Sequence, residues 1–309
     1  MRTSTVALAA ALAFALPSPT RAARKAAVPK EKLAAVRSTP CEAMPAPSQK
    51  EPWPAGERLS FEIDVMGASA GNLVLMALPP VGKGTSRELP LRALAASNSF
   101  FSKVRRVRGR STSYVRARDM HPRRYEEESN EDGVHRSANV VFQRPSEGAV
   151  VKVDWRRDEE KGRANLRYAN DAFDPVSAAY FLRTVEFEKG QNLCFDSYGI
   201  RKLWRVQGEV VGKEQVRVPA GSFEAWHLEG VAVRTDDPRS ARELHIWISA
   251  DERRLPLAAL GVLDLGAVRA QLTQIGKGPE ATEASIVADL ERPLPKAPKP
   301  APAARPRPR

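Results

Sequence analysis

The chain has 309 residues and a formal net charge of +12, which by itself would suit a polyanionic partner. The charge lies at the ends: residues 1–54 hold 8 Lys/Arg against 3 Asp/Glu, residues 291–309 hold 6 against 1, and the body between them carries only +2. A nearly neutral body has no field to gather polyanions, so we expect no nucleic-acid partner.

The first 22 residues are typical of a cleavable export signal. Arg2 precedes an apolar run over residues 6–16, and Thr20 and Ala22 occupy the positions before a signal-peptidase cut. The run is shorter than the ~20 apolar residues of a membrane-spanning helix, and no later segment approaches that length. We therefore expect no transmembrane segment and a periplasmic or secreted location.

Both flanks of the body have the composition of disordered chain. Residues 23–54 are rich in Ala, Pro and Lys without sustained periodicity, and residues 276–309 end in a run of Pro, Lys and Arg. We interpret them as a linker and a tail. Residues 55–275 show no composition break, which predicts a single β-rich domain large enough for a sizeable core.

Strand patterns dominate this body. Residues 59–65 alternate apolar and polar side chains, and after Gly67 and Gly71 a second strand follows over 72–78, which predicts a hairpin. Turns rich in Gly, Pro and Asp separate further predicted strands at 91–98, 104–115, 123–129, 134–142, 150–155, 192–198, 203–211, 214–218, 223–233, 243–249 and 263–273. The fold class is mainly β: a strongly curled antiparallel sheet, or an incomplete barrel or roll.

One segment predicts a helix. Asp174 can cap it, Pro175 suits its first position, and Val176, Ala179 and Tyr180 follow at helical spacing. We expect this short helix to pack on the concave face of the sheet or to close one end.

The only cysteines are Cys41 and Cys194. An oxidising compartment permits a disulfide, which would attach the N-terminal segment to the body. The alternative is two unpaired thiols, with Cys194 packed in a strand. Sequence spacing does not decide between them, because a disulfide depends on local geometry.

Ser69 lies in a G-x-S-x-G match from Gly67 to Gly71, the pattern of a hydrolase nucleophile elbow. The elbow needs a helix after the serine, whereas here a second strand follows. Small residues in a hairpin turn explain the same letters, so we favour a turn over a catalytic Ser69.

The four histidines are His121, His135, His227 and His245, and they are scattered singly. No metal-binding spacing appears among them, so no metal ligand and no cofactor is predicted. His245 is the best candidate, because it shares a strand face with Trp247. A catalytic base needs a positioned partner, and the sequence does not identify one.

A basic stretch precedes an acidic one in the middle of the body. Nine Lys/Arg stand between residues 103 and 124 against the single acidic Asp119, and five Asp/Glu follow over 126–132. Arg105 and Arg108, with their basic neighbours, would form an anion-binding stripe. Alternatively the two strands lie side by side and their charges pair, which we favour.

Five ordered segments carry a family resemblance: GERLSFE from residue 56, the turn with Gly67 and Gly71, DPVSA from Asp174 with FLR after it, VPAGSFEAW with Pro219 and Gly221, and IWIS with Trp247 followed by Asp251, Arg254 and Pro256. The chain resembles the bacterial exported family called domain of unknown function 3108. The resemblance implies a secreted or periplasmic β-rich domain. It implies no activity and no catalytic residues.

These observations lead to a functional hypothesis. The protein is a non-enzymatic periplasmic or envelope protein that binds an amphipathic ligand, a cell-wall component or a protein partner on its curled sheet. Lipid, glycan and envelope protein are the candidate partners, and His245, Trp247, Arg105 and Arg108 are the candidate contacts. The alternatives are an envelope hydrolase using Ser69 or a histidine, and an assembly factor acting through its Pro-rich basic tail.

Overall fold

The computed structural model describes residue 28 and residues 41–47, 51–169, 171–199, 201–263 and 266–278. The predicted signal peptide and the tail from residue 279 lie outside these residues. Over the described part, the chain forms one sheet of 15 strands, one α-helix and a few single-turn 3-10 helices.

Two series of strands meet at the centre of this sheet. The first runs outward: β1 (Glu57–Val65), β2 (Ala68–Ala77), β3 (Glu88–Ser97), β4 (Val107–Arg116), β5 (Pro122–Glu131), β6 (Val134–Phe142), β7 (Val150–Arg157) and β8 (Glu160–Arg167). The second runs back inward: β9 (Ala172–Phe173), β10 (Asn192–Gly199), β11 (Lys202–Val218), β12 (Gly221–Arg234), β13 (Asp237–Ser249), β14 (Pro256–Leu263) and β15 (Gly266–Lys277). β1 and β15 pair antiparallel in the middle, so the first and last of these strands hold each other.

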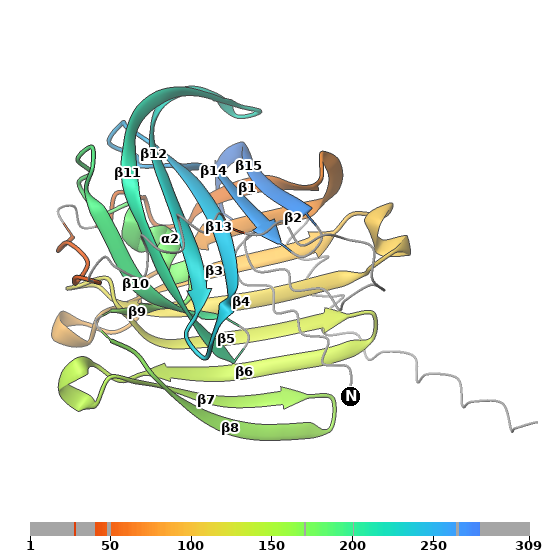
Figure 1. Ribbon diagram of the computed structural model, residues 1–309, viewed down its shortest axis with the longest axis vertical. Helices are drawn as coiled ribbons and strands as arrows, with labels where there is room; N and C mark the ends of the chain where they lie inside the picture. Colours follow the sequence, from red (N-terminus) through yellow and green to blue (C-terminus); the bar gives the residue numbers. More distant parts are fainter. Residues whose placement is uncertain are drawn as a thin grey trace, which may run out of the picture.

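The connection from β8 to β9 takes the chain from one edge of the sheet to the other, and the helix α2 (Pro175–Leu182) follows between β9 and β10. It contacts β3, β4, β9 and β10, and the curled sheet wraps around it (Figure 1). The edge strands β8 and β9 are not hydrogen-bonded to each other, so the sheet stays open. The predicted fold class, a curled antiparallel sheet with one short helix on it, is confirmed.

A buried cap fixes the start of α2. One oxygen of Asp174 accepts hydrogen bonds from the backbone N–H groups of Val176 (3.0 Å) and Ser177 (2.9 Å). The other accepts from the hydroxyl of Ser113 on β4 at 2.6 Å, which ties the helix to the sheet. Burial raises the pKa of the Asp174 carboxyl, although these hydrogen bonds oppose that rise.

Several predicted strands differ from those observed. Residues 203–211 and 214–218 form one strand, β11, because the expected turn at Gly212 is a bulge at which the pairing with β12 shifts register. β8 was not predicted, since this edge strand carries charged side chains and little apolar alternation. β14 was also missed, because its run of apolar and small residues lacks a period of two.

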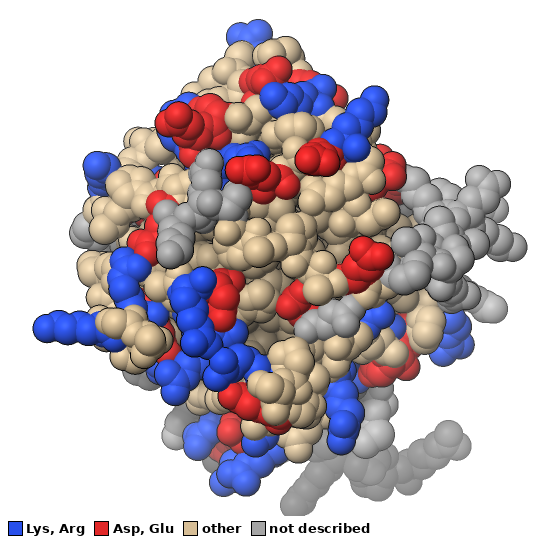
Figure 2. All heavy atoms as spheres, turned by 90° about the vertical axis from the view of Figure 1, so that its left-hand side faces the viewer, with Lys and Arg blue, Asp and Glu red and all other residues tan. Residues whose placement is uncertain are grey.

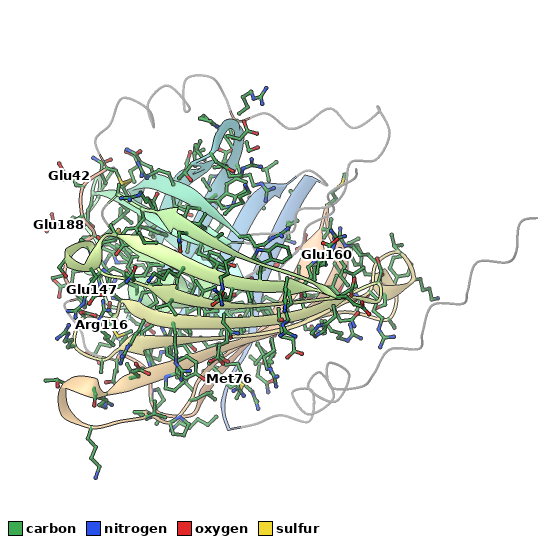
Figure 3. The ribbon with its side chains drawn as sticks, turned by 90° about the horizontal axis from the view of Figure 1, so that it is seen from below. Glu42, Met76, Arg116, Glu147, Glu160 and Glu188 are labelled. Carbon is green, nitrogen blue, oxygen red and sulfur yellow. A yellow bond between two sulfur atoms is a disulfide. The ribbon has the colours of Figure 1, made fainter. Side chains whose placement is uncertain are left out.

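Cys41 and Cys194 form a disulfide that attaches the N-terminal segment to β10, with their Cα atoms 5.2 Å apart. Seen from below, Glu42 lies at the same end of the curled sheet as Glu147 and Glu188, whereas Glu160 at the β7–β8 turn lies at the opposite end (Figure 3). The N-terminal segment therefore packs at one end of the sheet.

The expected disordered linker over residues 23–54 is wrong for its described final part. Met44 and Trp53 are buried in the main core. The backbone N–H of Met44 donates to the carboxylate of Asp171 at 2.7 Å. Two isolated apolar side chains give no periodic pattern. The composition therefore predicted disorder for a segment that packs on the core through these two side chains.

A buried ion pair joins the start of β1, the end of α2 and the β13–β14 turn. The guanidinium of Arg183 donates to both carboxylate oxygens of Glu57, at 2.6 and 2.9 Å, and both side chains are at most 5% exposed. It also donates to the carbonyls of Arg253 and Arg254, both at 3.0 Å. These acceptors together bind the N–H groups of the Arg183 guanidinium, because a charge buried in the core must be paired and hydrogen-bonded.

We predict that Glu57→Gln destabilises the fold strongly, because it leaves the Arg183 charge buried without its counter-ion. The expected loss is about 3–5 kcal/mol in the free energy of unfolding, measured by urea denaturation. The matched control is Asp154→Asn, which breaks an ion pair to Arg163 whose side chains are 64% and 90% exposed. That variant should change stability by less than about 0.5 kcal/mol, and equal losses in the two variants would refute the role of the buried pair.

Candidate functional site

A hollow of about 170 Å³ lies on the concave side of the sheet beside α2. Ala178, Ala179 and Leu182 of the helix line one side, and Leu244 and Ile246 of β13 are among the residues on the other walls. An apolar cavity of about 150 Å³ is large enough to admit a benzene ring. The concave face is therefore not filled by its own side chains.

Small residues keep this space open. Besides the two alanines of α2, the sheet contributes Ala232, Ala258 and Ala270 at positions where larger side chains would fill the space. A neighbouring hollow of about 40 Å³ shares Leu244 and Ile246 with it and continues along β11 and β12. The two hollows adjoin each other, and Glu209 and Glu229 are also among the residues that line the smaller one.

Arg242 is the one charged residue among the described residues lining the larger hollow. Its guanidinium lies over the ring of Trp204, 4.6 Å from the ring centroid. Figure 2 shows one side of the molecule with a central area of uncharged residues bordered by Lys, Arg, Asp and Glu. A ligand in the hollow would thus meet apolar walls and a single positive charge.

A polar cluster adjoins the hollow. The carboxylate of Glu127 on β5 accepts hydrogen bonds from the hydroxyls of Tyr125 (3.3 Å) and Tyr198 (3.2 Å), and Tyr198 also lines the hollow. Burial raises the pKa of Glu127 from 4.5 to about 7, and the two hydroxyl donors only partly oppose that rise. Sequence reasoning missed Glu127, because its acidic neighbours on β5 hid it in a charged run.

His245 and Trp247 lie on the opposite, outer face of β13, away from the hollow. The structure supplies the partner that the sequence did not identify: His227 Nε2 lies 3.0 Å from His245 Nδ1. The ring of Trp247 stacks on His227 with centroids 4.7 Å apart. Burial lowers the pKa of His227, with the neighbouring His245 adding to the effect and Glu214 opposing it. Only the register of β12 against β13 reveals this contact.

Arg105 and Arg108 do not share a common binding site. Arg105 pairs with Glu131 in the interior, and Arg110 pairs with Glu128 across β4 and β5 at 2.9 Å. Arg108 donates to the backbone carbonyl of Ser97 at 2.8 Å. The basic and acidic strands lie side by side, the arrangement favoured from the sequence.

Ser69 contacts Asn98 instead of a histidine. The Asn98 amide donates to the Ser69 carbonyl at 2.9 Å and to its hydroxyl at 3.3 Å. Ser69 lies on β2, whereas His227 and His245 lie on β12 and β13, with β1, β15 and β14 between them in the sheet. The serine and the candidate bases are therefore not assembled.

The remaining motif residues have structural contacts. A side chain at Gly71 would place its Cβ 2.2 Å from the carbonyl oxygen of Ala96 on the next strand, so only glycine fits. The carboxylate of Asp251 accepts from the Ser249 hydroxyl at 2.6 Å, and its carbonyl accepts from the Arg254 N–H at 3.1 Å. Three others stand at turns or strand starts: Gly67 in the β1–β2 turn, Pro219 before β12, and Gly221 at its first position. Pro256 opens β14 and lines the hollow.

Residues 60–273 match the family described as protein of unknown function DUF3108, and the chain belongs to that family. The inferred resemblance is thereby confirmed. No curated protein matches the chain. Over the described residues, no helix combines the length and the apolar character needed to cross a membrane.

One of the solved structures that match the chain shows a similar architecture. A β-barrel-like protein of the family DUF1849 from Brucella abortus matches with a TM-score of 0.51 at 8% identity, covering 77% of this chain and 100% of its own. A protein with a YmcC-like fold from Bacteroides fragilis matches at 11% identity, with a TM-score of 0.33 and coverage of 76% and 100%. At 8% identity the likeness to the Brucella abortus protein concerns the fold alone.

We predict that Glu127 makes stability depend on pH near neutrality. Its folded-state pKa of about 7 lies above the ordinary 4.5, so the folded protein holds a proton that the unfolded chain releases. Stability should therefore fall as the pH rises from about 4.5 to about 7, by a few kcal/mol at most. The urea concentration at the midpoint of unfolding, measured from about pH 4.5 to about pH 7, should fall less steeply with pH in Glu127→Gln than in the wild type.

The control for this experiment is Glu126→Gln, which changes the residue just before Glu127 on β5, a half-exposed glutamate paired with Arg124. In this variant the urea midpoint should fall with pH as steeply as in the wild type. If Glu127→Gln also keeps that slope, the carboxyl does not titrate as described.

Proposed function

We propose that this protein is an exported, non-enzymatic envelope protein that binds the apolar part of an amphipathic ligand in the hollow beside α2. The observation that carries the proposal is the hollow itself, apolar on nearly all sides and about 170 Å³ in volume. Ligand sites are typically such concave, mainly apolar spaces with a few placed polar groups.

Export is supported by the N-terminal signal pattern and by the disulfide. Arg2 and the apolar run that follows it suit a secretory signal. A structural disulfide between Cys41 and Cys194 suits an oxidising compartment, because cytosolic thiols are kept reduced.

The lining narrows the class of ligand. A glycan would leave its hydroxyl groups without partners against alanine, leucine and isoleucine side chains, so these walls favour hydrocarbon. Arg242 favours an anionic head group at the place where the lining becomes charged. The ligand class is therefore a lipid-like molecule with a short or branched apolar portion and a negative charge.

The hydrolase alternative receives no support from the contacts of Ser69, whose hydroxyl bonds to Asn98. The role of the tail as an assembly segment stays a prediction, since it falls beyond residue 278.

We predict that Ala179→Leu weakens ligand binding by filling the hollow. Leucine is a good helix former, so the substitution keeps α2 intact while its side chain takes up the space. Displacement of the fluorophore 1-N-phenylnaphthylamine by octanoate and dodecanoate measures the affinity. The variant should lose at least about tenfold in affinity, as expected when roughly two methylene contacts or more are excluded.

Ala241→Leu is the matched control, because it adds the same side chain to the outer face of β13 and should leave binding unchanged. Equal affinities in wild type, Ala179→Leu and Ala241→Leu would show that the hollow is not the binding site.

A further inference from the structure

Three potential metal-ligand atoms converge on the outer face of β12 and β13. His227 Nε2 and His245 Nδ1 are 3.0 Å apart, and His245 Nδ1 is 4.0 Å from Glu229 Oε2. One ligand atom from each of these residues lies within 4.8 Å of the others. Two imidazoles and one carboxylate are a ligand set that zinc sites use.

Strand pairing explains why the three side chains meet. His227 and Glu229 are two residues apart on β12, so their side chains point to the same face. His245 stands directly opposite Glu229 on β13. Both strands lie inside the sheet, between β11 and β14, and the backbone therefore holds the three positions rigidly.

A second set of groups surrounds the outward nitrogens of both rings. Glu243 Oε1 lies 3.6 Å from His245 Nε2, and Glu214 Oε1 lies 3.5 Å from His227 Nδ1. The indole N–H of Trp247 donates to that same Glu214 oxygen at 2.5 Å. Metal-bound histidines usually have a carboxylate at the second nitrogen, which orients the ring and increases its basicity.

We propose that His227, His245 and Glu229 form a site for a divalent transition-metal ion of the zinc type. Nitrogen donors favour such an ion over Ca²⁺ or Mg²⁺, which take oxygen ligands. Binding needs only a small adjustment, because nitrogens coordinated tetrahedrally at about 2.0–2.1 Å lie about 3.3 Å apart. Three protein ligands leave a fourth position for water or another small ligand.

The site is open to solvent, and none of its three ligand residues lines the larger hollow, although Glu229 borders the smaller one. The side chains of His227, His245 and Glu229 are 16%, 20% and 30% exposed, so an ion can reach them. On β13, His245 points outward while the neighbouring Leu244 and Ile246 line the hollow. Metal binding and ligand binding in the larger hollow therefore use different residues.

Isothermal titration of the full chain, without any added polyhistidine tag, with zinc chloride tests this site. Wild type should bind one equivalent of Zn²⁺. His227→Ala and His245→Ala should weaken the affinity by at least about 100-fold, and Glu243→Gln by roughly tenfold, the scale of losing an outer carboxylate. His135→Ala is the matched control, since it removes a histidine on β6 that contacts Glu128.

Equal affinity in wild type, His245→Ala and His135→Ala would overturn the proposal and leave a hydrogen-bonded histidine pair only. Glu229→Gln covers the case in which an alanine variant fails to fold, as judged by circular dichroism: it keeps the side-chain shape, and unchanged Zn²⁺ affinity in it also counts against the site. Ala179→Leu, which fills the hollow, should retain full Zn²⁺ binding, so failure of the lipid proposal and failure of the metal proposal are distinguishable.

Discussion

The ion pair between Arg183 and Glu57 is the contact on which the architecture depends. The Arg183 guanidinium stands at the end of α2 with its side chain 1% exposed, and its acceptors come from the first strand and from the β13–β14 turn. Trp53 and Tyr180 cover the guanidinium with aromatic rings, 4.8 and 5.2 Å from their centroids. Three of the segments that mark the family thus meet at one buried charge.

This constraint also accounts for the hollow. The pair holds the end of α2 against the centre of the sheet, while Asp174 ties its start to β4 through Ser113. A helix fixed at both ends cannot move to fill the space that small side chains such as Ala178 and Ala179 leave beside it. The apolar hollow is therefore maintained by polar anchors at the two ends of the helix.

Strand β13 shows how one strand can serve two environments. Its period of two sends Leu244, Ile246 and Ile248 to the hollow and His245 and Trp247 to the outer face. The inner set needs only to be apolar and correctly sized. The outer residues form a possible metal-ligand set only together with the neighbouring strand β12, which brings His227 and Glu229 to His245.

The sequence by itself determined the features that depend on residues close together along the chain. Alternation predicted most strands, the Asp174-Pro175 pair predicted the start of α2, and ordered motifs identified the family. Only the tertiary structure decided the partner of His245, the docking of Met44 and Trp53, and the pairing of Arg183 with Glu57, 126 residues away in the chain. The physical reason is that local patterns report which face of a strand is apolar. The curl and register of a sheet, which follow from packing over the whole chain, decide which faces meet.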